Sequence, residues 1–229
     1  MIPTVHTFYR SNIAPEMVEA QSNVFQHLGI PLKQWLDDTT THCEWIDQIL
    51  RSESEDDLAV IADIDAIPLN RNGFQSMVDM AASGALVGLA QVANHKDPNR
   101  LYAGPMFMAI SRRVFRELGA PSSCRTDQAD VAQSLTDAAE ANGIDVRLIY
   151  PRFAIQPRWP LAKEGLFGVG TFYGEQDFFH LFESRKSDAL ELFCAVSDGV
   201  IAGEHDFGRY LSILGQSSAR KRRFFGLLR

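Results

Sequence analysis

The sequence predicts an α/β fold, in which a mainly parallel central sheet is flanked by helices and followed by a C-terminal extension of loops and helices. Short apolar segments typical of strands alternate with amphipathic segments typical of helices from residue 5 to residue 150. Residues 58–62 are apolar without alternation, which is typical of a parallel strand covered on both faces. Strands that are joined through helices imply right-handed crossovers, and therefore parallel neighbours in one sheet.

The composition is that of a globular domain. The chain has 229 residues, of which 45% are hydrophobic and 22% are charged, so residues 1–229 can form one domain with a substantial core. The formal net charge of −7 argues against nonspecific binding to nucleic acid, which requires a basic surface. The sequence has no apolar run of about 18 residues and does not open like a signal peptide, so we expect a soluble protein.

The elements that lead to residues 58–62 follow from β-forming residues, apolar faces and capping residues. In chain order we expect a strand at 5–10, a helix from Pro15 to Gly29, a strand at 30–35, a helix that begins with a capping box at 41–44, and an acidic turn at 53–57.

The same signals continue the alternation to residue 150. In chain order we expect a helix that ends at Gly84, a strand at 85–93, a polar loop at 94–100 that could contact substrate, a strand at 105–110, a short helix capped by Ser111, a longer helix capped by Thr126 or Asp127 and ended by Gly143, and an alternating strand at 144–150.

Residues 151–229 differ in character from the α/β body. Prolines and glycines are frequent from Pro151 to Gly174, which predicts loops, and we expect the glycine-rich residues 165–174 to form a mobile lid. Two helices then close the chain, with apolar faces around Phe193 and Tyr210. The tail 219–229 mixes basic and apolar residues, so it could lie on an anionic membrane surface, be solvated, or dock on the core.

The cysteines and the lack of an apolar span predict a compartment. Cys43, Cys124 and Cys194 are few, widely separated and without metal-binding spacing, which predicts no disulfide and fits a reducing cytosol. We therefore expect a cytoplasmic protein, with contact at the inner membrane face if the basic tail binds lipid.

Two aspartates follow the apolar strand at 58–62. Asp63 and Asp65 come at its carboxyl end, where open α/β sheets bind ligands. Carboxylate oxygens are the ligands that Mg²⁺ and Mn²⁺ prefer, and such ions are commonly shared with substrate phosphates. Two like charges at a hydrophobic strand end repel each other, and a bound cation removes that cost. A solvated loop is the alternative explanation of the pair.

In sequence, residues 60–69 (Val-Ile-Ala-Asp-Ile-Asp-Ala-Ile-Pro-Leu) resemble the metal-binding signature of glycosyltransferases with the GT-A fold, a Rossmann-like fold. Residues 102–107 (Tyr-Ala-Gly-Pro-Met-Phe) are similar to the Asn-Ala-Gly segment of the retaining family-eight transferases, with Tyr102 in place of asparagine. Residues 126–128 (Thr-Asp-Gln) resemble the Asp-Gln motif of that family. His180 falls where its late metal-binding histidine is expected, without the Gly and Lys-Pro-Trp residues that normally follow.

The resemblance implies a hexosyltransferase that depends on Mn²⁺ or Mg²⁺ and moves a sugar from a nucleoside diphosphate sugar, with UDP-sugars expected first, to a carbohydrate or other hydroxyl acceptor. The metal ligands would be Asp63, Asp65 and His180, and Asp63 could instead bind ribose and sugar hydroxyls. The resemblance also implies catalytic Asp127 and Gln128, and donor-binding Asp63, Ala103 and Gly104. Independently of it, the position of Thr7, Tyr9 and Arg10 at the end of the first strand makes them candidates for contacts with the base and phosphates of the donor.

Plain structural explanations compete with these roles. Tyr9 could be ordinary core, Arg10 a surface charge and Asp127 a helix cap. His205 and His95 compete with His180 as metal ligands.

Two other functions share the Asp-x-Asp pattern. A haloacid-dehalogenase-like phosphohydrolase would use Asp63 as its nucleophile, and a non-catalytic protein of the same fold would bind nucleotide sugars without turnover.

Overall fold

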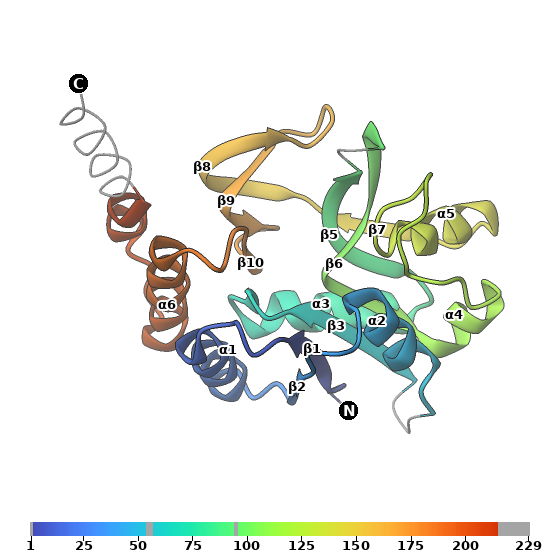
Figure 1. Cartoon of the computed structure of the whole chain (residues 1–229), viewed down its shortest axis with the longest axis horizontal. Helices are drawn as coiled ribbons and strands as arrows, with labels where there is room; N and C mark the ends of the chain where they lie inside the picture. The colour runs from blue at the N-terminus through green and yellow to red at the C-terminus, as the bar shows by residue number, and fades with distance from the viewer. Residues whose placement is uncertain (1, 54–56, 94–95, 215–229) are drawn as a thin grey trace.

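The computed structural model describes residues 2–53, 57–93 and 96–214. Its larger sheet is mixed, with the strand order β2-β1-β3-β6-β5-β7 among the described residues (Figure 1). All neighbouring strands run parallel except β6, which is antiparallel to β3 and to β5. The strands are β1 (Val5–Tyr9), β2 (Leu32–Leu36), β3 (Leu58–Asp63), β5 (Leu86–Ala93), β6 (Asp97–Ser111) and β7 (Val146–Ile149).

Helices cover both faces of this sheet. Val60 and Ala62 of β3 join a core formed with α1, α3 and α6, whereas Ala59 and Ile61 join a core formed with α2, α4 and α5. The strand is therefore buried on both faces, as its unbroken apolar sequence predicted. The helices are α1 (Pro15–His27), α2 (His42–Arg51), α3 (Arg71–Ala82), α4 (Arg112–Glu117), α5 (Gln133–Ala141) and α6 (Ser187–Ala202).

The prediction that residues 151–174 form loops is wrong. They contribute two strands to a second, antiparallel sheet in the order β4-β10-β9-β8, which consists of β4 (Ala66–Pro68), β8 (Pro151–Pro160), β9 (Leu166–Tyr173) and β10 (Phe178–Leu181). Two glycines of β9 serve close packing. A Cβ on Gly168 would lie 2.5 Å from the carbonyl oxygen of Gln156, and one on Gly170 would lie 2.9 Å from Leu192 Cδ2. Residues 166–173 therefore form a packed strand and not a lid.

Two boundaries also differ from the prediction. Residues 97–100, expected in a loop, belong to β6, where Arg100 pairs with Asp137 and Glu140. The helix expected to begin at residue 126 or 127 begins only at Gln133. The Thr126 hydroxyl accepts hydrogen bonds from the backbone of residues 128 and 129, which closes a local turn, and Ala132 has a left-handed backbone.

The prediction that the cysteines form no disulfide is also wrong. Cys43 and Cys124 are bonded, although 81 positions separate them in the sequence. The inference of a reducing cytosol from the cysteines therefore loses its basis. No helix within the described ranges is long and apolar enough to cross a membrane, and the basic tail 219–229 lies outside those ranges.

Candidate active site

The three residues predicted to bind a metal lie together where the two sheets meet. Asp63 is the last residue of β3, Asp65 lies in the turn that follows, and His180 belongs to β10, which pairs with β4 just beyond that turn. One ligand atom from each residue lies within 4.8 Å of the other two. His180 Nε2 is 3.4 Å from Asp65 Oδ1 and 4.0 Å from Asp63 Oδ2. The fold therefore brings two carboxylates and one imidazole to a single point.

Side-chain and backbone hydrogen bonds hold the turn that carries the aspartates. The side-chain amide of Gln21, from α1, donates to the carbonyl oxygens of Asp63 (2.8 Å) and Ala66 (3.0 Å). Gln34 of β2 in turn donates to the side-chain oxygen of Gln21. The Leu181 amide of β10 donates to the carbonyl of Asp65 at 2.9 Å. Both sheets and α1 thus fix the backbone from which the carboxylates project.

The chemistry of this cluster fits a divalent cation. His180 is 4% exposed, its Nε2 faces the aspartates, and its Nδ1 has no hydrogen-bond partner among the described residues. Burial raises the pKa of Asp63, and the charge of Asp65 raises it further, while His42 and His180 act in the opposite direction. An oxygen-rich set with one nitrogen suits Mn²⁺, and a cation would relieve the repulsion between the two carboxylates.

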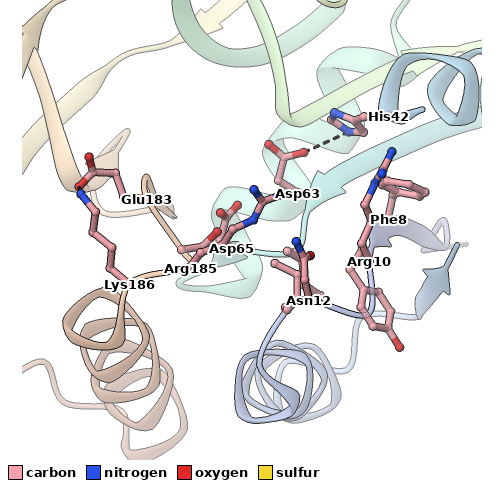
Figure 2. A pocket seen from close by; sticks show the side chains of 13 residues that line it. Phe8, Arg10, Asn12, His42, Asp63, Asp65, Glu183, Arg185 and Lys186 are labelled. Carbon is pink, nitrogen blue, oxygen red and sulfur yellow. Dashed lines mark ion pairs between the residues drawn. The ribbon is translucent and has the colours of Figure 1, made fainter. Parts of the chain in front are cut away.

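A first cavity of about 510 Å³ opens beside the aspartates (Figure 2). Its walls come from the end of β1, the loop before α1 and the segment 183–186 before α6. Arg10 and Arg185 line this cavity together with the two aspartates, and Figure 2 labels all four side chains. Arg10 also donates to the carbonyl of Thr40 at 3.2 Å. The remaining lining residues include Phe8, Tyr9, Asn12, Ile13, Glu183 and Lys186. The cavity therefore combines aromatic and cationic groups next to the metal ligands.

A second cavity of about 320 Å³ borders the same aspartates. It shares His42, Asp63, Asp65 and Glu183 with the first cavity and is otherwise lined by Gln91, Tyr102, Pro105, Met106, Asp130, Val131, His180, Leu181 and Phe182. Burial, helped by two nearby aspartates, strongly raises the pKa of Tyr102. Its hydroxyl therefore stays protonated and can donate a hydrogen bond. Two cavities thus meet at the candidate metal site.

The donor-binding residues named from the sequence fall into two groups. Tyr9 and Arg10 line the first cavity. Thr7 is buried in β1, and Ala103 and Gly104 are buried in β6 without lining either cavity. A Cβ on Gly104 would lie 3.0 Å from the carbonyl oxygen of residue 89 in β5, so the glycine allows close packing of the two strands.

The catalytic residues named from the sequence lie in the loop before α5. Asp127 and Gln128 are both exposed and line neither cavity, and the Asp127 carbonyl accepts a hydrogen bond from Lys96. Asp130 and Val131 of the same loop line the second cavity instead.

Sequence reasoning did not single out His42, Arg185 or Asp130, each of which lines a cavity that the aspartates also line. His42 lies inside the capping box that we used only as a helix signal, and the structure confirms that box through Thr41 and Glu44. Arg185 lies shortly after His180 in a segment that has no recognisable sequence motif. Its closeness in sequence to a candidate metal ligand is the only signal that could have identified it.

The competing histidines have other positions. His205 Nδ1 lies 3.0 Å from the Tyr210 hydroxyl within an aromatic cluster, and burial lowers its pKa. This is the environment of a structural side chain. His95 lies outside the described residues.

No protein-family model and no curated protein matches the sequence. Among solved structures, the chain resembles the galactosyltransferase LgtC in complex with donor and acceptor sugar analogues, with a TM-score of 0.47 and 9% identity over 86% of this chain and 96% of that one. It also resembles Drosophila β1,4-galactosyltransferase 7 with manganese, UDP-Gal and xylobiose (TM-score 0.47, 12% identity, 80% of this chain and 72% of that one). A third match is the mannosyltransferase PcManGT from Pyrobaculum calidifontis with GDP-Man and Mn²⁺ (TM-score 0.46, 13% identity, 63% of this chain and 53% of that one).

The solved structures that the chain resembles thus include three glycosyltransferases. Because these TM-scores lie below 0.5 and the identities are low, what those proteins bind is a property of those proteins. The function of this chain has to be inferred from its own residues.

Proposed function

We propose that the protein is a metal-dependent glycosyltransferase that moves a sugar from a nucleoside diphosphate sugar to an acceptor hydroxyl. The observation that carries the proposal is the convergence of Asp63, Asp65 and His180 beside a cavity that also contains Arg10 and Arg185. A site with both metal ligands and guanidinium groups is suited to a diphosphate, which carries negative charge on several oxygens. We expect the donor to be a UDP-sugar. We expect Mn²⁺ in preference to Mg²⁺, because one of the metal ligands is an imidazole.

The first cavity would bind the nucleotide. Phe8 and Tyr9 offer aromatic surface to a base, and Asn12 offers hydrogen bonds to ribose. Arg10 and Arg185 would donate hydrogen bonds to the diphosphate and so stabilise the charge that develops as it leaves. A cation held by Asp63, Asp65 and His180 would add Lewis-acid stabilisation of that leaving group.

The second cavity would hold the transferred sugar and the acceptor. Tyr102 can donate a hydrogen bond, Gln91 offers an amide, and Asp130 offers a carboxylate. A carboxylate at this position can accept the proton of the acceptor hydroxyl or stabilise positive charge at the anomeric carbon. Asp127 and Asp130, both in the loop before α5, are the two carboxylates that could have this role. The variants Asp127→Asn and Asp130→Asn decide between them, because only loss of the catalytic carboxylate abolishes turnover.

The test is an activity assay with a panel of nucleoside diphosphate sugars, Mn²⁺ and simple sugar acceptors. Release of nucleoside diphosphate together with a glycosylated acceptor, both abolished by EDTA and by Asp65→Asn, is the expected result. Asp79→Asn, an exposed aspartate of α3, is the matched control and should be fully active.

Three other outcomes would replace the proposal. Formation of pyrophosphate would indicate nucleotidyl transfer. Release of inorganic phosphate from phosphate esters, lost in Asp63→Asn, would indicate a phosphohydrolase with Asp63 as nucleophile. Binding of the donor without any turnover would indicate a non-catalytic binding protein.

A further inference from the structure

The two oxygens of the Asp63 carboxylate have different neighbours. Oδ2 faces the candidate metal site and lies 4.0 Å from His180 Nε2, whereas Oδ1 lies 3.2 Å from His42 Nε2, as the dashed line in Figure 2 marks. If the ring N–H of His42 donates a hydrogen bond to Oδ1, that bond fixes the rotation of the Asp63 carboxylate. It would therefore hold Oδ2 toward Asp65 and His180. A residue that makes a hydrogen bond to a metal-ligating side chain commonly sets both the orientation and the basicity of that side chain.

His42 is itself held by aromatic rings and by the helix it begins. Its imidazole stacks on Phe8 (ring centroids 5.8 Å apart, planes at 16°) and on Trp45 (5.9 Å, 18°). It is the first residue of α2, directly after the capping residue Thr41. The position of the first turn of α2 therefore decides where the imidazole lies.

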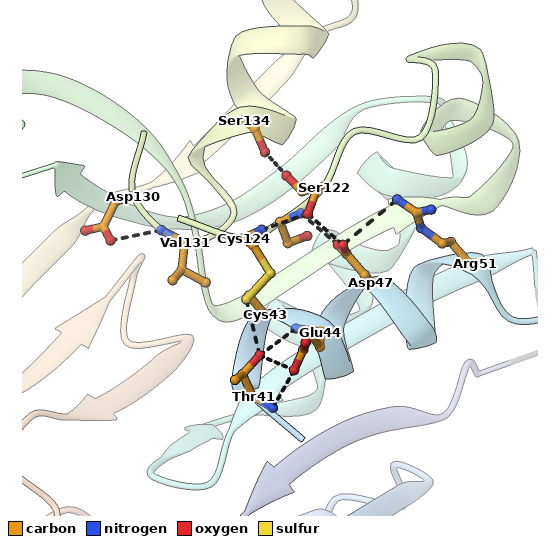
Figure 3. The surroundings of a disulfide bond; sticks show 11 residues. Thr41, Cys43, Glu44, Asp47, Arg51, Ser122, Cys124, Asp130, Val131 and Ser134 are labelled. Atoms are coloured by element: carbon orange, nitrogen blue, oxygen red, sulfur yellow. Dashed lines mark hydrogen bonds and ion pairs between the residues drawn. A yellow bond between two sulfur atoms is a disulfide. The ribbon is translucent and has the colours of Figure 1, made fainter. Parts of the chain in front are cut away.

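A disulfide anchors that first turn. Cys43, the residue after His42, is bonded to Cys124 in the segment between α4 and α5, with the two Cα atoms 4.8 Å apart (Figure 3). Asp47, one turn further along α2, also accepts hydrogen bonds from Ser122 and from the backbone amide of residue 123. The segment that contains Cys124 continues to Asp130, which lines the second cavity. The disulfide thus joins two elements that reach the aspartates from different parts of the chain.

We propose that His42 is a positioning residue for Asp63, and that the Cys43–Cys124 disulfide holds His42 in place, so that cation affinity at this site depends on the disulfide. The inference rests on the proposed function only in taking Asp63, Asp65 and His180 as the cation ligands. Both cysteines are partly exposed, so a dithiol can reach the bond. The dithiol supplies two electrons and two protons, the S–S bond becomes two cysteine thiols, and the dithiol becomes a disulfide.

The experiment measures the dissociation constant of Mn²⁺ alone by titration calorimetry, without any donor or turnover. His42→Phe keeps an aromatic ring between Phe8 and Trp45 but removes the donor, and should weaken binding by about 10-fold to 100-fold, the usual effect of losing such a group. His42→Asn keeps a side-chain donor and should retain more of the affinity. Equal affinities of wild type and His42→Phe would overturn the positioning role.

A coupling measurement tests the link to the disulfide. The variant Cys43→Ser/Cys124→Ser should weaken Mn²⁺ binding in a wild-type background and should have no further effect in the His42→Phe background, because both changes remove the same contact. Additive losses, or no loss at all, would overturn the link. Cys194→Ser changes the free cysteine and is the matched control.

Folding and the underlying site are checked separately. Circular dichroism and thermal unfolding show whether each variant is folded. If the double serine variant does not fold, wild-type protein reduced with dithiothreitol and then alkylated takes its place, and undiminished Mn²⁺ affinity of that protein contradicts the link. Absence of Mn²⁺ binding by the wild type itself would instead contradict the metal site, and with it the proposed function.

Discussion

Asp63→Asn should stabilise the protein without metal while removing its response to Mn²⁺. The Asp63 and Asp65 carboxylates have oxygens no more than 4.8 Å apart. Coulomb's law then gives a repulsion of about 1 kcal/mol with the dielectric constant of water and about 3.5 kcal/mol with an effective value of 20. His42 Nε2 lies 3.2 Å from Asp63 Oδ1, so an asparagine oxygen in that place can accept a hydrogen bond from it, and little else is lost. For a chain of this size each kcal/mol corresponds to about 2–4 °C in melting temperature.

The assay is thermal unfolding at pH 8, with and without Mn²⁺, after treatment with EDTA. The variant should melt at least about 2 °C above wild type when both lack metal. Excess Mn²⁺ should stabilise wild type, by about 2.7 kcal/mol at one hundred times its dissociation constant, and should leave the variant unchanged. Asp79→Asn is the control and should behave as wild type in both conditions. If the variant is less stable than wild type without metal, the view that the charge of Asp63 destabilises the metal-free protein, and that a cation relieves this destabilisation, is refuted.

The dependence of this difference on pH follows from the raised pKa of Asp63. Burial is the main cause, and it makes the folded chain favour the protonated carboxyl. That contribution to stability is fully present below the ordinary value of 3.8 and is lost as the pH rises through the raised pKa of the folded state. The stability gap between the variant and wild type should therefore be widest at neutral and alkaline pH and should narrow on acidification.

Three further predictions address the neighbourhood of the site. Arg185→Ala should weaken the binding of UDP with Mn²⁺ by roughly tenfold or more, since a hydrogen bond to a charged group contributes about 1.5–3 kcal/mol. Arg113→Ala, which changes an exposed residue of α4, is the control and should bind UDP as tightly as wild type. Equal calorimetric affinities of wild type and Arg185→Ala would exclude Arg185 from the donor site. His205→Ala should cost about 1 kcal/mol of stability, through one lost hydrogen bond, and should leave Mn²⁺ affinity unchanged; a large loss of that affinity would instead identify it as a ligand. Gly168→Val should prevent folding or strongly lower the melting temperature, because its Cβ would lie 2.5 Å from a backbone carbonyl oxygen of β8; an unaffected melting temperature would contradict the close packing.

The α/β body was predictable because its signals are local. Residues 59–62 are buried on both faces of the sheet, as an unbroken apolar run requires, and the capping box at 41–44 begins α2 as predicted. The second sheet was missed because its strands contain the residues that usually mark loops. In β9, Gly168 and Gly170 are needed where neighbouring atoms approach closely, and no local pattern distinguishes that need from flexibility.

The candidate site was predictable only where the residue type indicated the chemistry. Asp63 and Asp65 could be named because two acids at the end of an apolar strand imply a ligand, and the expected convergence with His180 is found in the structure. His42 and the Cys43–Cys124 bond could not be named, because they depend on contacts between segments far apart in the chain. The disulfide spans 81 positions and joins two segments that no motif relates.

The most direct test of the central claim is an anomalous difference map from crystals soaked with Mn²⁺ and UDP, recorded near the manganese absorption edge. We predict a single strong peak within about 2–2.5 Å of carboxylate oxygens of Asp63 and Asp65 and of His180 Nε2, with the diphosphate of UDP next to it in the cavity that contains Arg10 and Arg185. A peak elsewhere, or a diphosphate bound away from these residues, would contradict the assignment of this site.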